Sequence, residues 1–145
     1  MNNTQFVEFT DEQNERINEL ADEYRARVEG STLKRDYDFP QTFNEMAQDV
    51  HANSRAHGWW EQDRNNGEMI ALMHSELSEA LEAFRHGNPP DDHIPDFSGV
   101  EAELADVVIR IMDMAVARGL RVGDAIIAKH KYNVARPHKH GGKAF

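Results

Sequence analysis

Apolar residues recur along this chain at the three- and four-residue spacing of α-helices, and the alternation typical of strands is nearly absent. Three capping-box pairs mark helix starts: Thr10 with Gln13, Thr42 with Glu45, and Ser98 with Glu101. Glycines that favour the left-handed conformation mark helix ends: Gly30, Gly58, Gly87 and Gly119. We therefore predict an all-α helical bundle, with helices over roughly 11–29, 42–57, 66–86, 99–118 and 123–135.

The segments between these helices divide the chain. Residues 31–41 are polar and charged, which predicts a linker after an N-terminal helix. The stretch Asn88–Phe97 contains Pro89, Pro90 and Pro95, so we expect a semi-rigid crossing between two core helices. No core-forming pattern follows Pro137. The predicted organisation is an N-terminal helix and linker (1–41), a helical domain (42–136) and a flexible C-terminal tail (137–145).

The predicted helix over 66–86 carries two carboxylates on an otherwise apolar face. Its expected core stripe comprises Ile70, Met73, Leu77, Leu81 and Phe84. A neighbouring stripe comprises Met69, Leu72, Glu76, Glu79 and Ala83. Glu76 and Glu79 lie one turn apart in that stripe and point the same way.

The predicted helix over 99–118 repeats this arrangement. It is apolar nearly all round, and its inner polar residues fall on one line: Glu103, Asp106, Arg110 and Asp113. A carboxylate on a buried face is costly unless it is paired or binds a metal. A divalent cation would neutralise both acidic pairs, and oxygen ligands suit Mg²⁺ or Mn²⁺ better than zinc. The alternative is a salt-bridged bundle in which Arg110 and lysines neutralise the acids.

Composition narrows the classes of function. A chain of 145 residues predicts one domain, and a net charge of −10 argues against a broad basic surface for nucleic acid. The absence of cysteine excludes disulfides, thiolate catalysis and sulfur-ligated zinc. No leader pattern opens the chain, and no apolar run approaches the ~18 residues of a membrane span, so we expect a cytoplasmic protein with no membrane partner.

The motif Glu76-x-x-Glu79 followed by Glu103-x-x-Asp106 resembles the signature of the MazG-like all-α NTP pyrophosphohydrolase superfamily, which includes dimeric dUTPases and dCTP pyrophosphatases. The similarity runs from about Thr42 to Arg136. It implies a hydrolase that converts a (d)NTP and water into the (d)NMP and pyrophosphate, with Mg²⁺ as cofactor and Mn²⁺ as the alternative. Wide apolar faces and the resemblance both predict a homodimer or homotetramer with sites at the subunit interface.

The resemblance also implies site residues. Metal ligands would be Glu76, Glu79, Glu103 and Asp106, with Glu79 also orienting or deprotonating the attacking water. Substrate-binding residues would be Lys129, Asn133 and Arg136 for phosphates, and His51 and Trp59, beside Trp60, for base and sugar. His51 could equally be a packed histidine, and the tryptophans could be core residues.

Arg110 departs from the family pattern, since relatives often carry an aromatic residue at this position. We expect Arg110 either to bind phosphate or to act as the counter-ion of Asp113, and we favour the second. The departure leaves the preferred base and sugar open.

Two other classes of function compete with this hypothesis. A di-iron carboxylate bundle would need Glu-x-x-His pairs, and no histidine stands at that spacing from the acidic pairs. A non-enzymatic helical module that binds a nucleotide or regulates a partner remains the alternative, and it predicts that the acids tolerate alanine.

Overall fold

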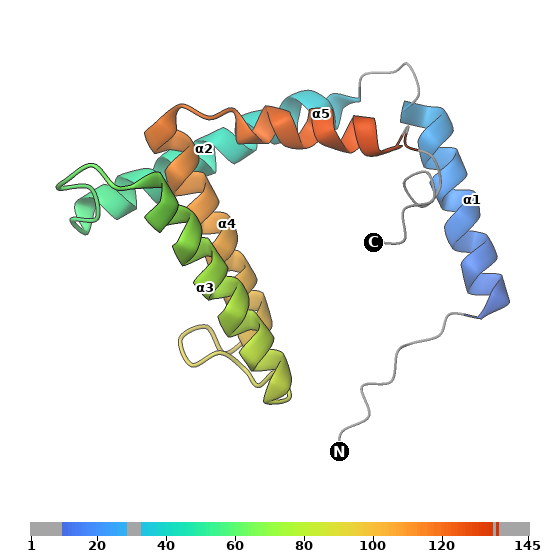
Figure 1. Cartoon of the computed structure of the whole chain (residues 1–145). Coiled ribbons are helices and arrows are strands. Elements are labelled where there is room, and N and C mark those ends of the chain that lie inside the picture. Colours follow the sequence, from blue (N-terminus) through green and yellow to red (C-terminus); the bar gives the residue numbers. More distant parts are fainter. Residues whose placement is uncertain (1–9, 29–32, 135, 137–145) are drawn as a thin grey trace. The chain divides into compact units, whose positions relative to one another are not determined.

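The structure, a computed structural model, describes residues 10–28, 33–134 and 136. Over these residues the elements are five helices: α1 (Asp11–Val28), α2 (Lys34–Ala56), α3 (Asn66–Arg85), α4 (Gly99–Arg118) and α5 (Val122–Val134) (Figure 1). The prediction of an all-α fold is confirmed. Within the described part of the chain, no helix combines the length and apolar character needed to cross a membrane. The predicted tail and the helix end at Gly30 lie outside the described residues.

The chain divides into two compact units. One unit combines Met1–Tyr37 with Ile127–Phe145, and the other is Asp38–Ile126. Helices α2 and α5 each contribute residues to both units, and α3 and α4 belong wholly to the second. The acidic motifs therefore lie in the second unit, and the predicted phosphate-binding residues of α5 lie in the first.

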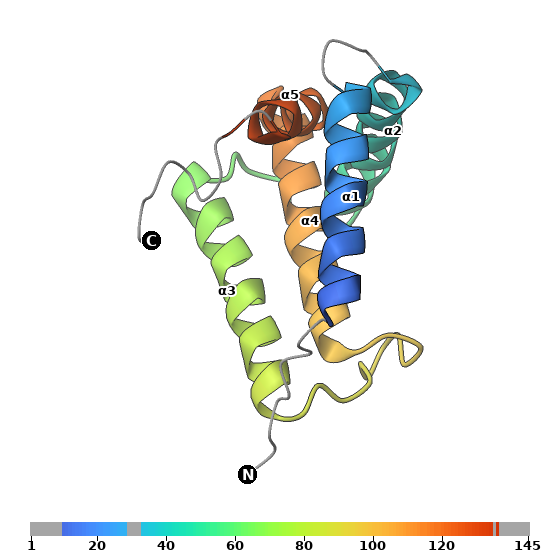
Figure 2. The ribbon, with the colours of Figure 1, turned by 90° about the vertical axis from the view of Figure 1, so that its right-hand side faces the viewer.

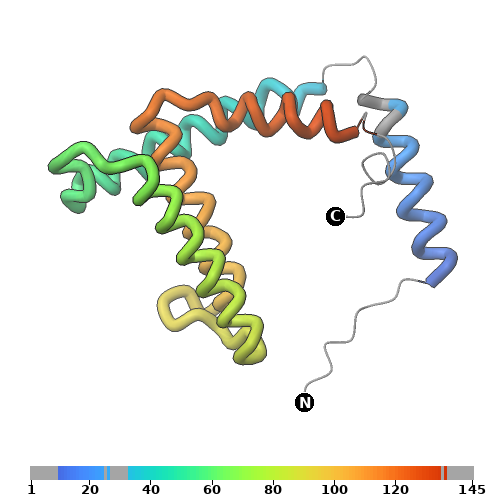
Figure 3. The backbone as a smooth tube through the Cα atoms, viewed as in Figure 1, coloured from blue at the N-terminus to red at the C-terminus, as the bar shows by residue number. Residues whose placement is uncertain are grey.

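Helices α3 and α4 form an antiparallel hairpin, in which they run side by side over most of their length (Figures 1 and 2). The buried apolar residues of the pair are Met69, Met73, Ala80, Val100, Met112 and Ala115. A non-helical loop, residues 86–98, joins the two helices at one end of the hairpin, as the tube in Figure 3 traces. The predicted crossing between two core helices is thus confirmed.

Local hydrogen bonds explain where α4 begins and ends. The Ser98 side chain accepts from the Glu101 backbone N–H, and the Glu101 carboxylate accepts in return from the Ser98 backbone N–H at 2.8 Å. At the other end Gly119 adopts the left-handed conformation with φ of 63°, which costs a glycine little. The sequence predicted both signals correctly.

Helix α2 begins at Lys34, so the prediction that residues 34–41 form a linker is wrong. The helix starts because the Asp36 carboxylate accepts from the Leu33 backbone N–H at 3.0 Å and pairs with Lys131 Nζ at 2.6 Å. The sequence did not reveal this start for two reasons. Leu33 has no side-chain oxygen that could act as an N-cap acceptor, and the contact between Asp36 and Lys131 joins residues far apart in the chain. Thr42 consequently lies inside α2 and caps nothing.

A cluster of buried apolar residues in the Asp38–Ile126 unit joins α2 to α4. Phe43, Ala47 and Val50 pack with Met112, and Val116 and Val122 pack against them. Gly123, at the start of α5, lies against α2 so closely that a Cβ there would come within 3.1 Å of the Pro40 Cα. This packing holds one end of the α3–α4 hairpin to α2.

The predicted core stripe of α3 is largely exposed in the single chain. Met73 is buried, but the other members are between 44% and 62% exposed: Ile70, Leu77, Leu81 and Phe84. The face that α3 buries carries Met69, Met73, Glu76 and Ala80 instead. The sequence pattern identified an apolar face but could not tell which of two neighbouring faces meets α4.

Replacing Ser98 by alanine should lower the free energy of unfolding by about 1 kcal/mol, because the N-cap of α4 loses its acceptor. Urea denaturation followed by circular dichroism measures this change. Ser78→Ala is the matched control, since the Ser78 hydroxyl only donates back to the His74 carbonyl on the exposed side of α3. Equal effects of the two substitutions would contradict the capping interpretation.

Candidate metal centre

Three carboxylates meet across the α3–α4 hairpin. Glu76 of α3 and Glu103 and Asp106 of α4 each offer an oxygen, and these oxygens all lie within 4.8 Å of one another. Glu76 is only 6% exposed, whereas Glu103 is half-buried and Asp106 is exposed. The cluster is therefore anchored in the helix interface and open to solvent on one side.

Glu79, the fourth predicted ligand, is exposed and does not belong to this group of mutually close oxygens among the described residues. Its charge still reaches the cluster, because it helps raise the pKa of Glu103. The catalytic assignment of Glu79 and its role as a ligand stay predictions.

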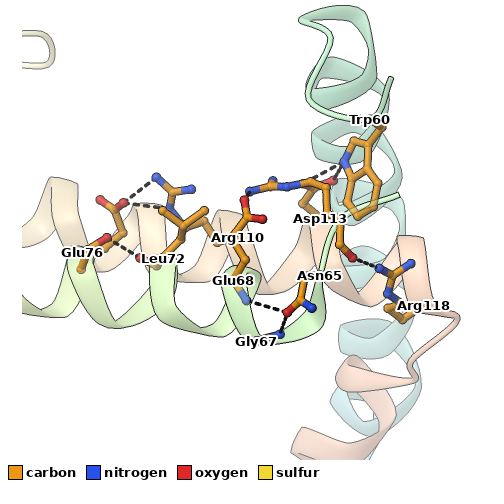
Figure 4. Close-up of polar contacts among 11 residues, drawn as sticks. Trp60, Asn65, Gly67, Glu68, Leu72, Glu76, Arg110, Asp113 and Arg118 are labelled. Carbon is orange, nitrogen blue, oxygen red and sulfur yellow. Dashed lines mark hydrogen bonds and ion pairs between the residues drawn. The ribbon is translucent and has the colours of Figure 1, made fainter. Parts of the chain in front are cut away.

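Arg110 pairs with Glu76 and not with Asp113, so the favoured prediction for this arginine is wrong. Its Nε and Nη2 lie 2.8 and 2.5 Å from the same Glu76 oxygen, Oε1. Figure 4 shows the Arg110 side chain reaching from α4 to the Glu76 carboxylate on α3. Because Arg110 stands one turn after Asp106 on α4, its side chain reaches the acid cluster and not the next turn.

Crowding of like charges perturbs the two acids of α4. Burial first, then a hydrogen bond with Glu76 and the charges of Glu79, Glu76 and Asp106, raise the pKa of Glu103. Burial and then the charge of Glu76 raise the pKa of Asp106, while the guanidinium of Arg110 acts in the opposite direction. Burial and neighbouring acids thus outweigh the one guanidinium near these two carboxylates.

The donor set of the cluster fits a hard divalent cation. Its three donors are all carboxylate oxygens, which Mg²⁺ and Mn²⁺ prefer and which zinc sites rarely consist of. A cation there would relieve the repulsion that raises the pKa of Glu103 and Asp106. The three carboxylates are therefore suitable ligands for Mg²⁺ or Mn²⁺.

A cavity of about 200 Å³ adjoins the cluster, and Asp106 and Arg110 form part of its wall. Other wall residues are Trp59, Arg64, Leu72 and Asp113. Trp59 is 61% exposed, and the Arg64 guanidinium carbon lies 5.6 Å from the centroid of its indole ring. The wall thus combines a flat aromatic surface, two guanidinium groups and one acid of the cluster.

His51 and Trp60 bind a buried carboxylate that belongs to the wall of this cavity, that of Asp113. Asp113 lies 2.7 Å from His51 Nδ1 and accepts from Trp60 Nε1 at 3.0 and 3.1 Å (Figure 4). The His51 and Trp60 rings also meet edge to face, with centroids 5.2 Å apart. His51 therefore has a carboxylate partner, and its role toward a substrate stays a prediction. Trp59 is the tryptophan that lines the cavity of about 200 Å³.

The three predicted phosphate-binding residues lie near the end of α5, in the other unit. Lys129 Nζ lies 4.9 Å and the Arg136 guanidinium carbon 5.8 Å from the centroid of the Tyr132 ring. Asn133 is exposed, and its carbonyl accepts from the Arg136 backbone N–H. The structure brings these cations together around one tyrosine, and their role toward a substrate stays a prediction.

Sequence reasoning missed the arginines that frame the tryptophans. Arg118 donates to Asn66 and Asp63 and to the Arg64 carbonyl, and its guanidinium carbon lies 5.7 Å from the Trp60 ring centroid. Figure 4 shows Arg118 at the end of α4 nearest Trp60. Arg64 and Arg118 have no periodic signal in sequence, because they connect a loop to a helix end.

Replacing Glu103 by glutamine should stabilise the metal-free protein at neutral pH. The folded-state pKa of Glu103 is raised, so its contribution to stability is full below the ordinary pKa of a glutamate and is lost as pH rises through the folded-state value. The excess stability of the variant should therefore shrink as pH falls toward 4. Thermal unfolding in EDTA across pH 4–8 measures it.

Glu101→Gln is the matched control on the same helix and has the opposite sign. Hydrogen bonds from Ser98 lower the pKa of Glu101, so its stabilisation is present above the ordinary glutamate pKa and is lost as pH falls. This variant should be less stable than the natural chain at neutral pH. Stabilisation by both substitutions would contradict the electrostatic account of the cluster.

Comparison with known proteins assigns no relative. No protein-family model, no curated protein and no solved structure matches the chain.

Proposed function

We propose that the chain is a metal-dependent nucleoside-triphosphate pyrophosphohydrolase, which converts a (d)NTP and water into the (d)NMP and pyrophosphate. The single observation that carries the proposal is the meeting of Glu76, Glu103 and Asp106 across α3 and α4. These are the positions to which the acidic motifs assign the metal ligands. The proposal joins this geometry to the resemblance in the motifs.

The residues of the cluster would hold Mg²⁺ or Mn²⁺. When bound, the ion supplies charge neutralisation on phosphate oxygens and a more acidic water. Glu76, Glu103 and Asp106 fix its place, since they come from two packed helices. Glu79 stands one turn from Glu76 on α3 and is exposed, so it is free to orient or deprotonate a water.

The cavity beside the cluster supports a nucleotide as the substrate class. Aromatic side chains bind the flat face of a nucleobase, and the exposed Trp59 ring forms part of the cavity wall. Arginine pairs well with phosphate oxygens, and Arg110 stands between the cavity and the acids. A base at Trp59 would thus place its phosphates toward the metal ligands.

The exposed stripe of α3 supports a homo-oligomer as the assembly. Ile70, Leu77, Leu81 and Phe84 share one face of the helix and are largely uncovered in the single chain. Contiguous exposed apolar surface of this kind marks interaction sites in proteins. We propose that a second copy covers this stripe in a homodimer or homotetramer.

The Arg110–Glu76 ion pair favours a second candidate function. A cluster already neutralised in part by an arginine would suit a helical module that binds a nucleotide without hydrolysing it. Such a module would use the same cavity, and it would not need a divalent cation. The release of pyrophosphate separates the two candidates.

Asp106→Ala should reduce Mg²⁺-dependent pyrophosphate release at least about a hundredfold, because a lost ligand forfeits several kcal/mol of charge stabilisation in the transition state. The assay measures pyrophosphate and monophosphate from a panel of canonical, deoxy and modified NTPs, with Mg²⁺, Mn²⁺ or EDTA. Glu103→Ala should behave in the same way.

Glu82→Ala is the control for this assay, because Glu82 pairs with Arg85 on the exposed side of α3. It should retain full activity. Nucleotide binding without turnover in the natural chain would favour the non-enzymatic module. Release of orthophosphate alone would identify a different phosphohydrolase.

Leu81→Glu should convert the assembly to monomers, because it places a charge in the middle of the exposed α3 stripe. Sedimentation velocity at several protein concentrations measures the change. His74→Glu, on the polar side of the same helix, is the control and should leave the assembly intact. A natural chain that sediments as a monomer would refute the proposed assembly.

A further inference from the structure

Arg110 occupies an unusual position among the cations of the helix hairpin. The other arginines of α3 and α4, Arg85 and Arg118, stand in the last turn of their helices. Arg110 stands in the middle of α4, and its side chain is 35% exposed beside a Glu76 side chain that is 8% exposed. It is thus the cation that neutralises the most buried acid of the cluster.

The contact between these two residues involves the acid that a metal would also need. Nε and Nη2 of Arg110 lie 2.8 and 2.5 Å from one oxygen of Glu76, Oε1. Glu76 is at the same time one of the three carboxylates whose oxygens lie within 4.8 Å of one another. A guanidinium and a divalent cation next to the same carboxylate repel each other, so they compete for it.

Space for a second position of the Arg110 side chain adjoins the cluster. It forms part of the wall of the cavity of about 200 Å³ that adjoins the cluster. Trp59 and Arg64 form other parts of this wall. A guanidinium that left Glu76 would therefore face a cavity where an anion could bind it, and it would not be buried without a partner.

We propose that Arg110 is the resident counter-ion of the metal centre: a divalent cation displaces it from Glu76, and the displaced guanidinium then binds an anionic phosphate group in the adjoining cavity. This inference rests on the proposed metal-dependent function. It makes Arg110 a residue that weakens the binding of the cation and strengthens the binding of the phosphate group.

The first test is a calorimetric titration of the metal-free protein with Mn²⁺. Arg110→Gln removes the competing charge, so Mn²⁺ should bind about tenfold more tightly than to the natural chain. In EDTA the same variant should unfold at a lower temperature, because Glu76 loses its partner, and saturating Mn²⁺ should restore the loss. A merely structural arginine would weaken Mn²⁺ binding when it is removed.

Arg85→Gln is the matched control. It removes the same charge from the same hairpin, but Arg85 pairs with the exposed Glu82 at the end of α3. Its affinity for Mn²⁺ should stay within about twofold of the natural value, because exposed charges are screened by solvent. An equal gain in both variants would attribute the effect to net charge and overturn the proposal.

The second test uses inorganic pyrophosphate at saturating Mn²⁺. Arg110→Gln should bind pyrophosphate about tenfold more weakly, because it lacks the displaced guanidinium. Tighter Mn²⁺ binding together with weaker pyrophosphate binding is the expected pair of results. Unchanged or weaker Mn²⁺ binding overturns the displacement, and unchanged pyrophosphate binding overturns the phosphate contact.

The two tests separate this inference from the proposed function. If the natural chain binds no Mn²⁺ at all, the metal centre itself is refuted. If the natural chain, Arg110→Gln and Arg85→Gln all bind Mn²⁺ with the same affinity, the metal centre stands and only the role of Arg110 is refuted.

Discussion

The burial of the Glu76 carboxylate between α3 and α4 is the constraint on which the site depends. An ionised carboxylate that is 6% exposed must have a cation beside it, or it destabilises the helix pair that buries it. Arg110 supplies that cation from α4. Because Arg110 pairs with Glu76, the nearby Glu103 and Asp106 have no ion-pair partner of their own among the described residues. The hairpin therefore holds more negative than positive charge at this point.

Local signals in the sequence predicted the helices well, whereas contacts between distant residues were not predictable. Ser98 with Glu101 and Gly119 mark the ends of α4 because both signals act within a few residues of the chain. The start of α2 depends on Lys131, which stands almost a hundred residues after Asp36, and no local pattern encodes it. The same reasoning explains α3, whose two apolar faces look alike until the position of α4 decides which one is buried.

The sequence predicted which acids gather at the site, but it did not predict which side chains they pair with. Helical spacing identified Glu76, Glu103 and Asp106 as acids that share an interface, and the structure brings them together. It could not show that Glu79 is exposed while Glu76 is buried, because the two acids stand only one turn apart on α3. Spacing favoured Asp113 as the counter-ion of Arg110, whereas the structure pairs Arg110 with Glu76, because the partner depends on how far α3 stands along α4. Asp113 instead binds His51 and Trp60.

A purely structural ion pair between Arg110 and Glu76 would neutralise only part of the charge of the cluster. Three ionised carboxylates and one guanidinium would carry a net charge of −2, and hydrophobic replacement of buried ion pairs is often neutral or stabilising. Two uncompensated charges on oxygen ligands match the charge of one Mg²⁺ or Mn²⁺ ion. The cavity wall adds an aromatic face and two guanidinium groups beside these negative charges; the residues are Trp59, Arg64 and Arg110. In the function that we propose, a nucleotide with its metal ion would complement each of these features, whereas a metal ion or an organic base alone would complement only part of them.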